Sequence, residues 1–144
     1  MSEQRSAVRG PREIVQEFFD AQASGDDQAV IGLFAPDATW DIPGDPAVVP
    51  WVGSRNREGI GDYLTLQRDN SEPTGFELYT WLVDGPDVVV LGRFAYRFAS
   101  GGSIDDPFAV HLVVRDGLIR SFRIFEDSLS LARGYTGTAV VSAS

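Results

Sequence analysis

The sequence predicts an α+β fold in which helices come first and an antiparallel sheet follows. Residues 11–34 and 57–67 carry apolar side chains at the spacing of amphipathic helices. From residue 76 the apolar side chains recur with a period of two, in segments that glycine-containing turns separate. Because each element keeps one apolar face, we expect the helices to cover one face of the sheet and to leave a cavity between the layers.

Two helices are expected to form a hairpin near the N-terminus, and a third is expected ahead of the main sheet. Pro11 suits the first position of a helix, and Gly25 supplies the end of that helix. Asp26 is placed to cap a second, shorter helix, which is expected to end at Pro36. The third helix is expected over residues 57–67.

Short apolar runs that alternate with polar residues predict the strands. They are expected over residues 38–42, 76–83, 87–98, 104–115 and 118–126. A long loop to Gly53 follows the first strand, and the last four strands are expected to form one antiparallel meander. Residues 134–144 show no periodicity, so we expect a flexible tail after an ordered core of residues 11–133. The whole chain, 1–144, is expected to form one domain.

Composition excludes several classes of function. The 12 Lys+Arg stand against 21 Asp+Glu, and the net charge of -9 disfavours nucleic acids and anionic membranes as partners. The absence of cysteine removes disulfides and thiol nucleophiles, and one histidine without a spaced carboxylate motif argues against a metal centre. No membrane span or signal peptide is recognisable, so we expect a cytoplasmic protein without a cofactor.

The last hairpin decides which side chains share a face of the sheet. A two-residue Asp116-Gly117 loop would place Val110 beside Arg123, whereas a three-residue loop keeps the apolar side chains together. We prefer the three-residue loop for that reason. In this register Asp106 lies opposite Glu126, at one end of the apolar face.

Two arginines are predicted to join these acids. A two-residue Gly101-Gly102 loop places Arg97 opposite Asp106, with Arg93 deeper on the same face. Carboxyl groups crowded beside apolar walls have a raised pKa and can transfer protons near neutral pH, and an arginine can bind an oxyanion. The alternative interpretation is a row of ordinary cross-strand salt bridges at the end of a sheet.

His111 is expected on the opposite face, together with Phe94, Tyr96, Phe98 and Phe125. Such an aromatic surface is too apolar for open solvent, so we expect a homodimer that packs through the outer face of the sheet. This placement makes His111 a weaker candidate for catalysis than the two acids, despite its capacity as a general base.

Four stretches in this order point to a known family. They are GDDQAVIGLFAPDATW, PWVG, VVVLGRF and VVRDGLIRSFRIFEDSLSLA. Over about residues 11–133 the chain resembles the SnoaL-like and ketosteroid-isomerase-like proteins of the nuclear-transport-factor-two-like superfamily. The resemblance implies a cone-shaped α+β barrel, in which N-terminal helices pack on a curved, mostly antiparallel sheet around an apolar pocket, and it implies frequent dimers.

Carried over residue by residue, the resemblance implies an altered active site. The catalytic base of the steroid isomerases falls at Ile42 in this sequence, and their tyrosine on the first helix falls at Phe18. Only their oxyanion-stabilising acid is matched, by Asp106. The Arg-x-Asp and the further Asp of the limonene epoxide hydrolases fall at residues 91–93 and Ile124, where they are not matched.

The broader SnoaL-like group, which includes polyketide ring cyclases, therefore guides the functional hypothesis. We expect a small acid–base enzyme of cyclase or isomerase type that acts on an apolar cyclic or polyketide-like metabolite. The expected catalytic residues are Asp106, Glu126 and Arg93. The expected substrate-binding residues are Arg97, Trp40, Trp51, Tyr63, Val110, Phe122 and Ile124.

Three alternatives stay open at this point. The domain could bind a small molecule or a protein without catalysis, because fold alone does not separate binding proteins from enzymes. It could hydrolyse epoxides with rearranged acids. Asp41 is expected at the surface or anchoring a loop, but a strand end bent by Pro43 could turn it into the pocket as the base.

Overall fold

The computed structural model describes residues 9–137 as a six-stranded sheet with helices against one of its faces. The elements are α2 (Pro11–Ser24), α3 (Asp27–Gly32), β1 (Phe34–Ile42), β2 (Gly53–Asn56), the 3-10 helix η1 (Arg57–Gly59), α4 (Ile60–Asn70), β3 (Ser71–Asp84), β4 (Asp87–Phe98), β5 (Ser103–Arg115), β6 (Leu118–Phe125) and α5 (Ser128–Thr136). The expected order of helices and then a meander is confirmed.

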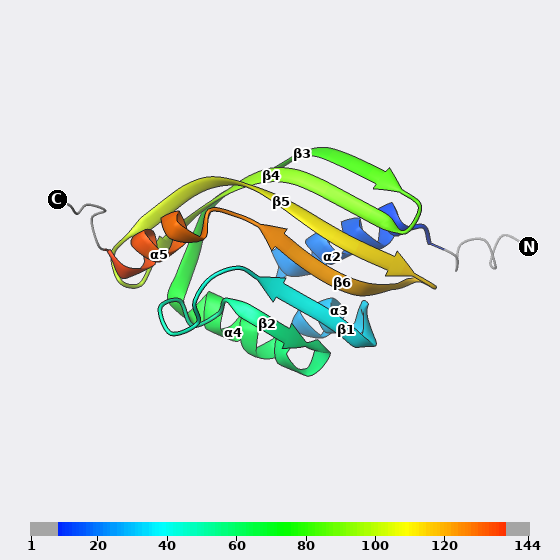
Figure 1. The fold of residues 1–144 in the computed structure, drawn as a ribbon, viewed down its shortest axis with the longest axis horizontal. Helices are drawn as coiled ribbons and strands as arrows, with labels where there is room; N and C mark the ends of the chain where they lie inside the picture. The colour runs from blue at the N-terminus through cyan, green and yellow to red at the C-terminus, as the bar shows by residue number, and fades with distance from the viewer. Residues whose placement is uncertain (1–8, 138–144) are drawn as a thin grey trace, which may run out of the picture.

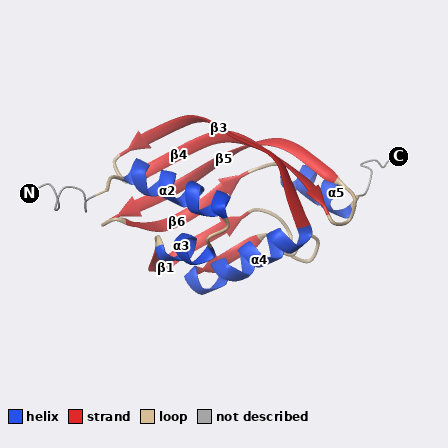
Figure 2. Ribbon diagram, turned by 180° about the vertical axis from the view of Figure 1, so that it is seen from behind, coloured by secondary structure: helices blue, strands red, loops and turns tan. Residues whose placement is uncertain are grey.

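The sheet has the strand order β2-β1-β6-β5-β4-β3. Strand β1 runs parallel to β6, and every other neighbouring pair is antiparallel. The sheet curves strongly without closing, which produces the cone shape visible in Figure 1. Helices α2, α3 and α4 lie against its concave side, and α5 lies at the end of the sheet next to the β4–β5 turn (Figure 2). The cavity described below lies between these layers.

Local sequence signals place the N-terminal helices as expected. Gly25 ends α2 with a φ of 74°, a conformation that glycine adopts without strain. The Asp26 side chain caps α3 by accepting a hydrogen bond from the Ala29 backbone N–H. However, α3 ends at Gly32, and the residues around Pro36 belong to β1. The first strand therefore begins four residues earlier than the predicted position, because Phe34 already pairs with Ile119 of β6.

Two elements were not predicted, and one expected tail is partly helical. Strand β2 begins at Gly53, where the expected loop ends, and α5 follows the last strand. Residues 134–136 of the expected flexible tail belong to α5, Gly137 caps that helix, and residues 138–144 lie outside the described part of the chain. Strand β3 begins at Ser71 because residues 71–75 also pair with β4, although Pro73 and Gly75 interrupt the alternation there.

The β5–β6 hairpin confirms the predicted face but not the predicted pairs. Its loop is the two-residue Asp116-Gly117 turn, in which both residues have positive φ. A shift in register between Val113 and Val114 then brings Val110 opposite Ile124, so the apolar side chains still share one face. Asp106 consequently has no direct strand partner in Glu126, which lies just beyond the end of β6.

The predicted register of the β4–β5 hairpin is wrong. Arg97 pairs with Ser103 and Arg93 pairs with Pro107, rather than with Asp106 and Val110. The loop is longer than the assumed two-residue Gly101-Gly102 loop. The Phe98 N–H donates a hydrogen bond to the Gly102 carbonyl, so the residues between them form the loop. The shift is an odd number of residues, so it moves every side chain of β4 to the other face relative to β5.

Aromatic side chains fill the core beside the cavity. Trp40 of β1 is fully buried and stacks on Phe122 of β6, with ring centroids 4.0 Å apart and planes inclined by 12°. Phe18 of α2 packs against both rings. In the range 9–137, no helix has the length and apolar character required to cross a membrane.

Candidate functional site

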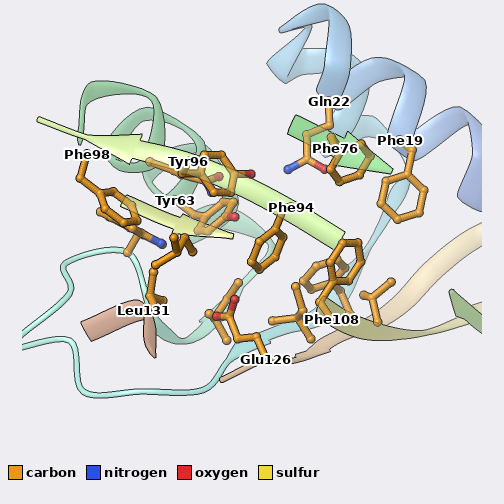
Figure 3. Close-up of a pocket in the computed structure, with 17 residues that line it drawn as sticks. Phe19, Gln22, Tyr63, Phe76, Phe94, Tyr96, Phe98, Phe108, Glu126 and Leu131 are labelled. Carbon is orange, nitrogen blue, oxygen red and sulfur yellow. The ribbon is translucent and has the colours of Figure 1, made fainter. Parts of the chain in front are cut away.

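A narrow cavity lies between the concave face of the sheet and helices α2, α4 and α5. It offers about 50 Å³ to the centre of a water molecule. The lining side chains are Phe19, Gln22, Ile42, Trp51, Tyr63, Gln67, Phe76, Phe94, Tyr96, Phe98, Ile104, Phe108, Val110, Phe122, Ile124, Glu126 and Leu131. Most of them are aromatic or aliphatic, and Figure 3 shows the rings arranged around the space. We call this space the inner chamber.

Several residues expected at the site do line the inner chamber. They are Trp51, Tyr63, Val110, Phe122, Ile124 and Glu126. Trp40 is not part of the lining but lies directly behind it, stacked on Phe122. Ile42, at the position of the isomerase base, also lines the chamber, so this wall offers an alkyl group where those enzymes place a carboxylate.

Glu126 is the ionisable acid of the inner chamber. It directly follows β6, and Figure 3 shows its carboxyl group pointing into the space between the rings. Burial first of all, and then the negative charges of Asp106 and Asp127, together raise its pKa to about 7. Among residues 9–137 its carboxyl group makes no hydrogen bond or ion pair. A carboxyl group in this state can both accept and donate a proton near neutral pH.

Asp106 influences Glu126 through its charge rather than by lining the chamber. It lies on β5, and its Oδ2 accepts a hydrogen bond of 2.6 Å from the Ser130 hydroxyl of α5. The expected proximity of the two acids is present, since the charge of Asp106 contributes to the raised pKa of Glu126. Its expected role as a second proton donor stays a prediction.

The Glu126 charge affects the pKa of two tyrosine side chains nearby, Tyr63 and Tyr96. The pKa of Tyr96 is raised to about 12, mainly by burial; a side-chain hydrogen bond with Gln67 lowers it and the Glu126 charge raises it, both to a lesser extent. Burial also raises the pKa of Tyr63 well above its ordinary value, with smaller contributions from Tyr96 and Glu126. Both phenols therefore stay protonated at neutral pH and can donate hydrogen bonds to an oxyanion.

Sequence reasoning missed Tyr96, Gln22 and Gln67 as site residues. It placed Phe94, Tyr96 and Phe98 on the outer face beside His111, and this assignment is wrong because all three line the inner chamber. The alternation within β4 could have predicted this placement. The buried Val88 and Val90 occupy even-numbered positions of the strand, as the three aromatic residues do, and therefore lie on the same face. The two glutamines carry no signal that separates them from surface residues.

The assignment of Arg93 and Arg97 to the pocket is also wrong. Both lie on the outer face of the sheet because of the register described above. Arg93 pairs with Asp105 at 2.6 Å and with Glu77 at 3.0 Å. Arg97 pairs with Glu72 at 2.9 Å and is 63% exposed. These arginines form cross-strand ion pairs and cannot reach an oxyanion in the chamber.

His111 and Asp41 also lie away from the inner chamber. His111 lies on the outer face as expected, with Nε2 at 2.7 Å from Oδ1 of Asp87. Asp41 accepts hydrogen bonds from the Ser54 hydroxyl and from Arg123, so it anchors β2 to its neighbours and does not enter the pocket. Within the described range 9–137, no three His, Asp or Glu side chains are grouped in a way that could hold a metal ion.

A second, larger space adjoins the inner chamber. It offers about 340 Å³ to the centre of a water molecule and opens between α2, α4 and β3. Its lining includes Ala23, Leu64, Arg68, Ser71 and Pro73. Five further residues line both spaces: Phe19, Gln22, Gln67, Phe76 and Tyr96. We call this second space the vestibule, because it adjoins the chamber at these shared side chains.

The chain belongs to the family of SnoaL-like domains. The sequence model of this family matches residues 15–122, which is most of the chain; of the chamber lining it leaves out Ile124, Glu126 and Leu131. No curated protein matches the chain.

Solved structures share this fold over nearly their full length. An NTF2-like protein from Burkholderia xenovorans is 27% identical, with a TM-score of 0.79 over 87% of this chain and 95% of that chain. An NTF2-like protein from Burkholderia thailandensis is 25% identical, with a TM-score of 0.77 over 88% and 98%. TerC, crystallised with polyporic acid, is 18% identical, with a TM-score of 0.74 over 87% and 97%, and this likeness shows the fold alone.

Proposed function

We propose that this protein is a cofactor-independent acid–base enzyme of cyclase or isomerase type, acting on an apolar cyclic or polyketide-like metabolite. The observation that supports it best is Glu126, whose carboxyl group points into an aromatic chamber without a hydrogen-bonding or ionic partner among residues 9–137. A pKa of about 7 makes its two protonation states comparable in population at neutral pH. The fold is one that supports several chemistries, so the site and not the fold supports the proposal.

The chemistry that this arrangement favours is proton transfer next to a carbonyl group. The Glu126 carboxylate would take a proton from the carbon beside the carbonyl, and the electron pair would move onto the carbonyl oxygen to give an enolate. Tyr63 and Tyr96 would donate hydrogen bonds to that oxygen. Protonated Glu126 would then return the proton to a different carbon. Alternatively, the enolate carbon would attack a second carbonyl to close a ring, the electrons of that carbonyl would move to its oxygen, and Glu126 would give its proton to the resulting alkoxide.

The geometry of the site bears on two alternative functions, ligand binding without catalysis and epoxide hydrolysis. Ligand binding without catalysis stays a candidate, and the observation that favours it is that Asp106 does not line the chamber beside Glu126. Epoxide hydrolysis loses support because it depended on an arginine beside the acids, and both candidate arginines lie on the outer face.

The decisive experiment compares the parent protein with Glu126→Gln. It measures the rate at which each catalyses deuterium exchange from D2O into a panel of cyclic aryl ketones. We expect exchange to fall by about a hundredfold or more, because a positioned general base contributes on the order of 10² to 10⁴ in rate. Glu58→Gln, an exposed glutamate on η1, is the matched control and should leave the rate unchanged. Exchange within a few-fold of the parent in Glu126→Gln would reject the proposal, and tight binding without exchange would favour the binding alternative.

We also propose that the outer face of the sheet forms a homodimer. Figure 2 shows the helices α2, α3 and α4 against the concave side, and the outer face exposes apolar side chains that a partner would cover. Tyr79, Leu82 and Phe125 are 58%, 54% and 54% exposed. Sedimentation at micromolar concentration tests this directly, and a purely monomeric profile would reject it.

A further inference from the structure

Two carboxamides stand where the vestibule meets the inner chamber. Gln22 comes from α2 and Gln67 from α4, and each lines both spaces. Figure 3 shows Gln22 projecting from its helix toward the chamber, between Phe76 and the Tyr96 ring. The other residues shared by the two spaces are Phe19, Phe76 and Tyr96, so these amides supply most of the polar groups at the junction.

The volumes decide how a ligand can be divided between the two spaces. On one and the same measure the inner chamber offers about 50 Å³ and the vestibule about 340 Å³, so the chamber is much the smaller of the two spaces. The vestibule, at about 340 Å³, falls in the range of sites for small metabolites. The vestibule therefore has the room for the ring system of a substrate, and a reactive group on that ring can extend through the junction toward Glu126.

The hydrogen-bonding capacity of the two amides differs. Gln67 is already engaged by a side-chain hydrogen bond with Tyr96. No hydrogen bond is made by the Gln22 side chain within the described residues, so its NH2 group and carbonyl oxygen are both available to a ligand. Together the amides offer a donor and an acceptor to an oxygen substituent such as a carbonyl or a hydroxyl group.

The charge at the entrance favours a neutral ligand. Arg68 is the basic residue of the vestibule wall, and its Nη2 already lies 2.6 Å from Oδ1 of Asp27. The remaining vestibule side chains are uncharged. An anion entering the chamber would also approach the Glu126 carboxyl group without a basic side chain in the chamber wall to balance it.

We propose that Gln22 and Gln67 are specificity-determining residues that recognise an oxygen substituent on a neutral, planar, largely apolar ring system held in the vestibule. This inference rests on the proposed function, because it identifies the substrate class for the Glu126 site. The amides would fix the ring in the orientation that directs its reactive carbon through the junction.

The test is calorimetric binding of 2-naphthol, naphthalene and 2-naphthoate to the full chain and to single variants. Gln22→Leu and Gln67→Leu remove the amide and leave an apolar side chain that is one atom shorter. We expect each to weaken 2-naphthol binding about three- to tenfold, the range expected for one lost hydrogen bond, and to leave naphthalene binding within twofold. Gln28→Leu, an exposed glutamine on α3, is the matched control and should change neither affinity.

Three results would overturn the proposal. They are an equal loss for naphthalene and 2-naphthol in the glutamine variants, tighter binding of 2-naphthoate than of 2-naphthol to the parent, and no binding of any probe at millimolar concentration. Glu126→Gln separates this inference from the proposed function. It should keep 2-naphthol binding within twofold at pH 5, so a failure of ketone exchange and a failure of ring recognition are observed in different variants.

Discussion

Arg93 binds both carboxylate oxygens of Asp105 on the outer face of the sheet, through hydrogen bonds of 2.6 Å from Nε and 2.8 Å from Nη2. The same guanidinium also reaches Glu77 at 3.0 Å, so it connects three neighbouring strands. These contacts satisfy the arginine outside the cavity. They also hold the pKa of Asp105 below its ordinary value, the hydrogen bond from Arg93 being the main cause.

The first prediction concerns this ion pair. Arg93→Gln should leave any proton exchange activity unchanged, because the side chain does not face the chamber. The carboxylate of Asp105 has a lowered pKa in the folded state, so the stabilisation it provides is present above the ordinary carboxylate value and disappears as the pH falls through the lower, folded value. The difference in unfolding free energy between parent and variant should therefore be small at pH 7, since both side chains are exposed, and should vanish in acid. Urea unfolding at both conditions measures it, and a large loss of activity would contradict the outward placement.

The contrast between Glu126 and Arg93 shows how far the sequence could predict this site. Both assignments depended on hairpin loops. In the β5–β6 hairpin the apolar alternation of Val110, Leu112 and Phe122 selects one face whatever the loop length, so the chamber wall was predictable. In the β4–β5 hairpin the turn glycines alone were used, and an error of three residues moved Arg93 to the wrong face.

Other features were beyond local patterns for a physical reason. Strand β1 pairs in parallel with β6, and this pairing stacks Trp40 on Phe122. The two strands are about eighty positions apart in the sequence, and no turn between them indicates that they pair. Helix α5 was missed because Gly134 interrupts its pattern, although Asp127 caps its start by accepting a hydrogen bond from the Ser130 N–H. Tertiary packing, and not propensity, makes these elements.

The second prediction concerns the close contact between α5 and β5. A Cβ atom at Gly134 would overlap Cγ2 of Ile104 and lie 2.7 Å from the Ser103 carbonyl oxygen. Gly134→Ala should therefore displace α5, which contributes Leu131 to the chamber wall, and cost about 1–3 kcal/mol of unfolding free energy. Gly32→Ala is the matched control, because a Cβ there meets nothing within 4 Å. Chemical denaturation measures both variants, and equal stability of the two would contradict the close packing.

The third prediction concerns the phenol groups beside Glu126. Tyr63→Phe and Tyr96→Phe each remove one hydrogen-bond donor and leave the ring in place. If these hydroxyls stabilise an enolate oxygen, ketone exchange should fall about ten- to a hundredfold, somewhat less than the effect of an ideally placed donor. Tyr79→Phe, on an exposed tyrosine of β3, should leave the rate unchanged. Rates that stay at the parent value in both chamber variants would exclude the tyrosines from the oxyanion site.

The fourth prediction concerns the pH dependence of stability that Glu126 introduces. Its pKa is raised from 4.5 to about 7 in the folded protein, mainly by burial. Between these values the folded state holds a proton that the unfolded chain has released, so raising the pH favours unfolding. The resulting loss of unfolding free energy is absent below about pH 4.5 and complete above about pH 7, and it is on the order of 3 kcal/mol.

Glu126→Gln tests this prediction, because its side chain stays neutral throughout this range. The unfolding free energy of the variant, measured by urea titration at pH 5 and pH 8, should therefore gain on that of the parent as the pH rises, whereas Glu58→Gln should follow the parent. A constant difference between Glu126→Gln and the parent across this interval would mean that the carboxyl group is not held in an apolar chamber, and the proton transfer proposed for it would lose its physical basis.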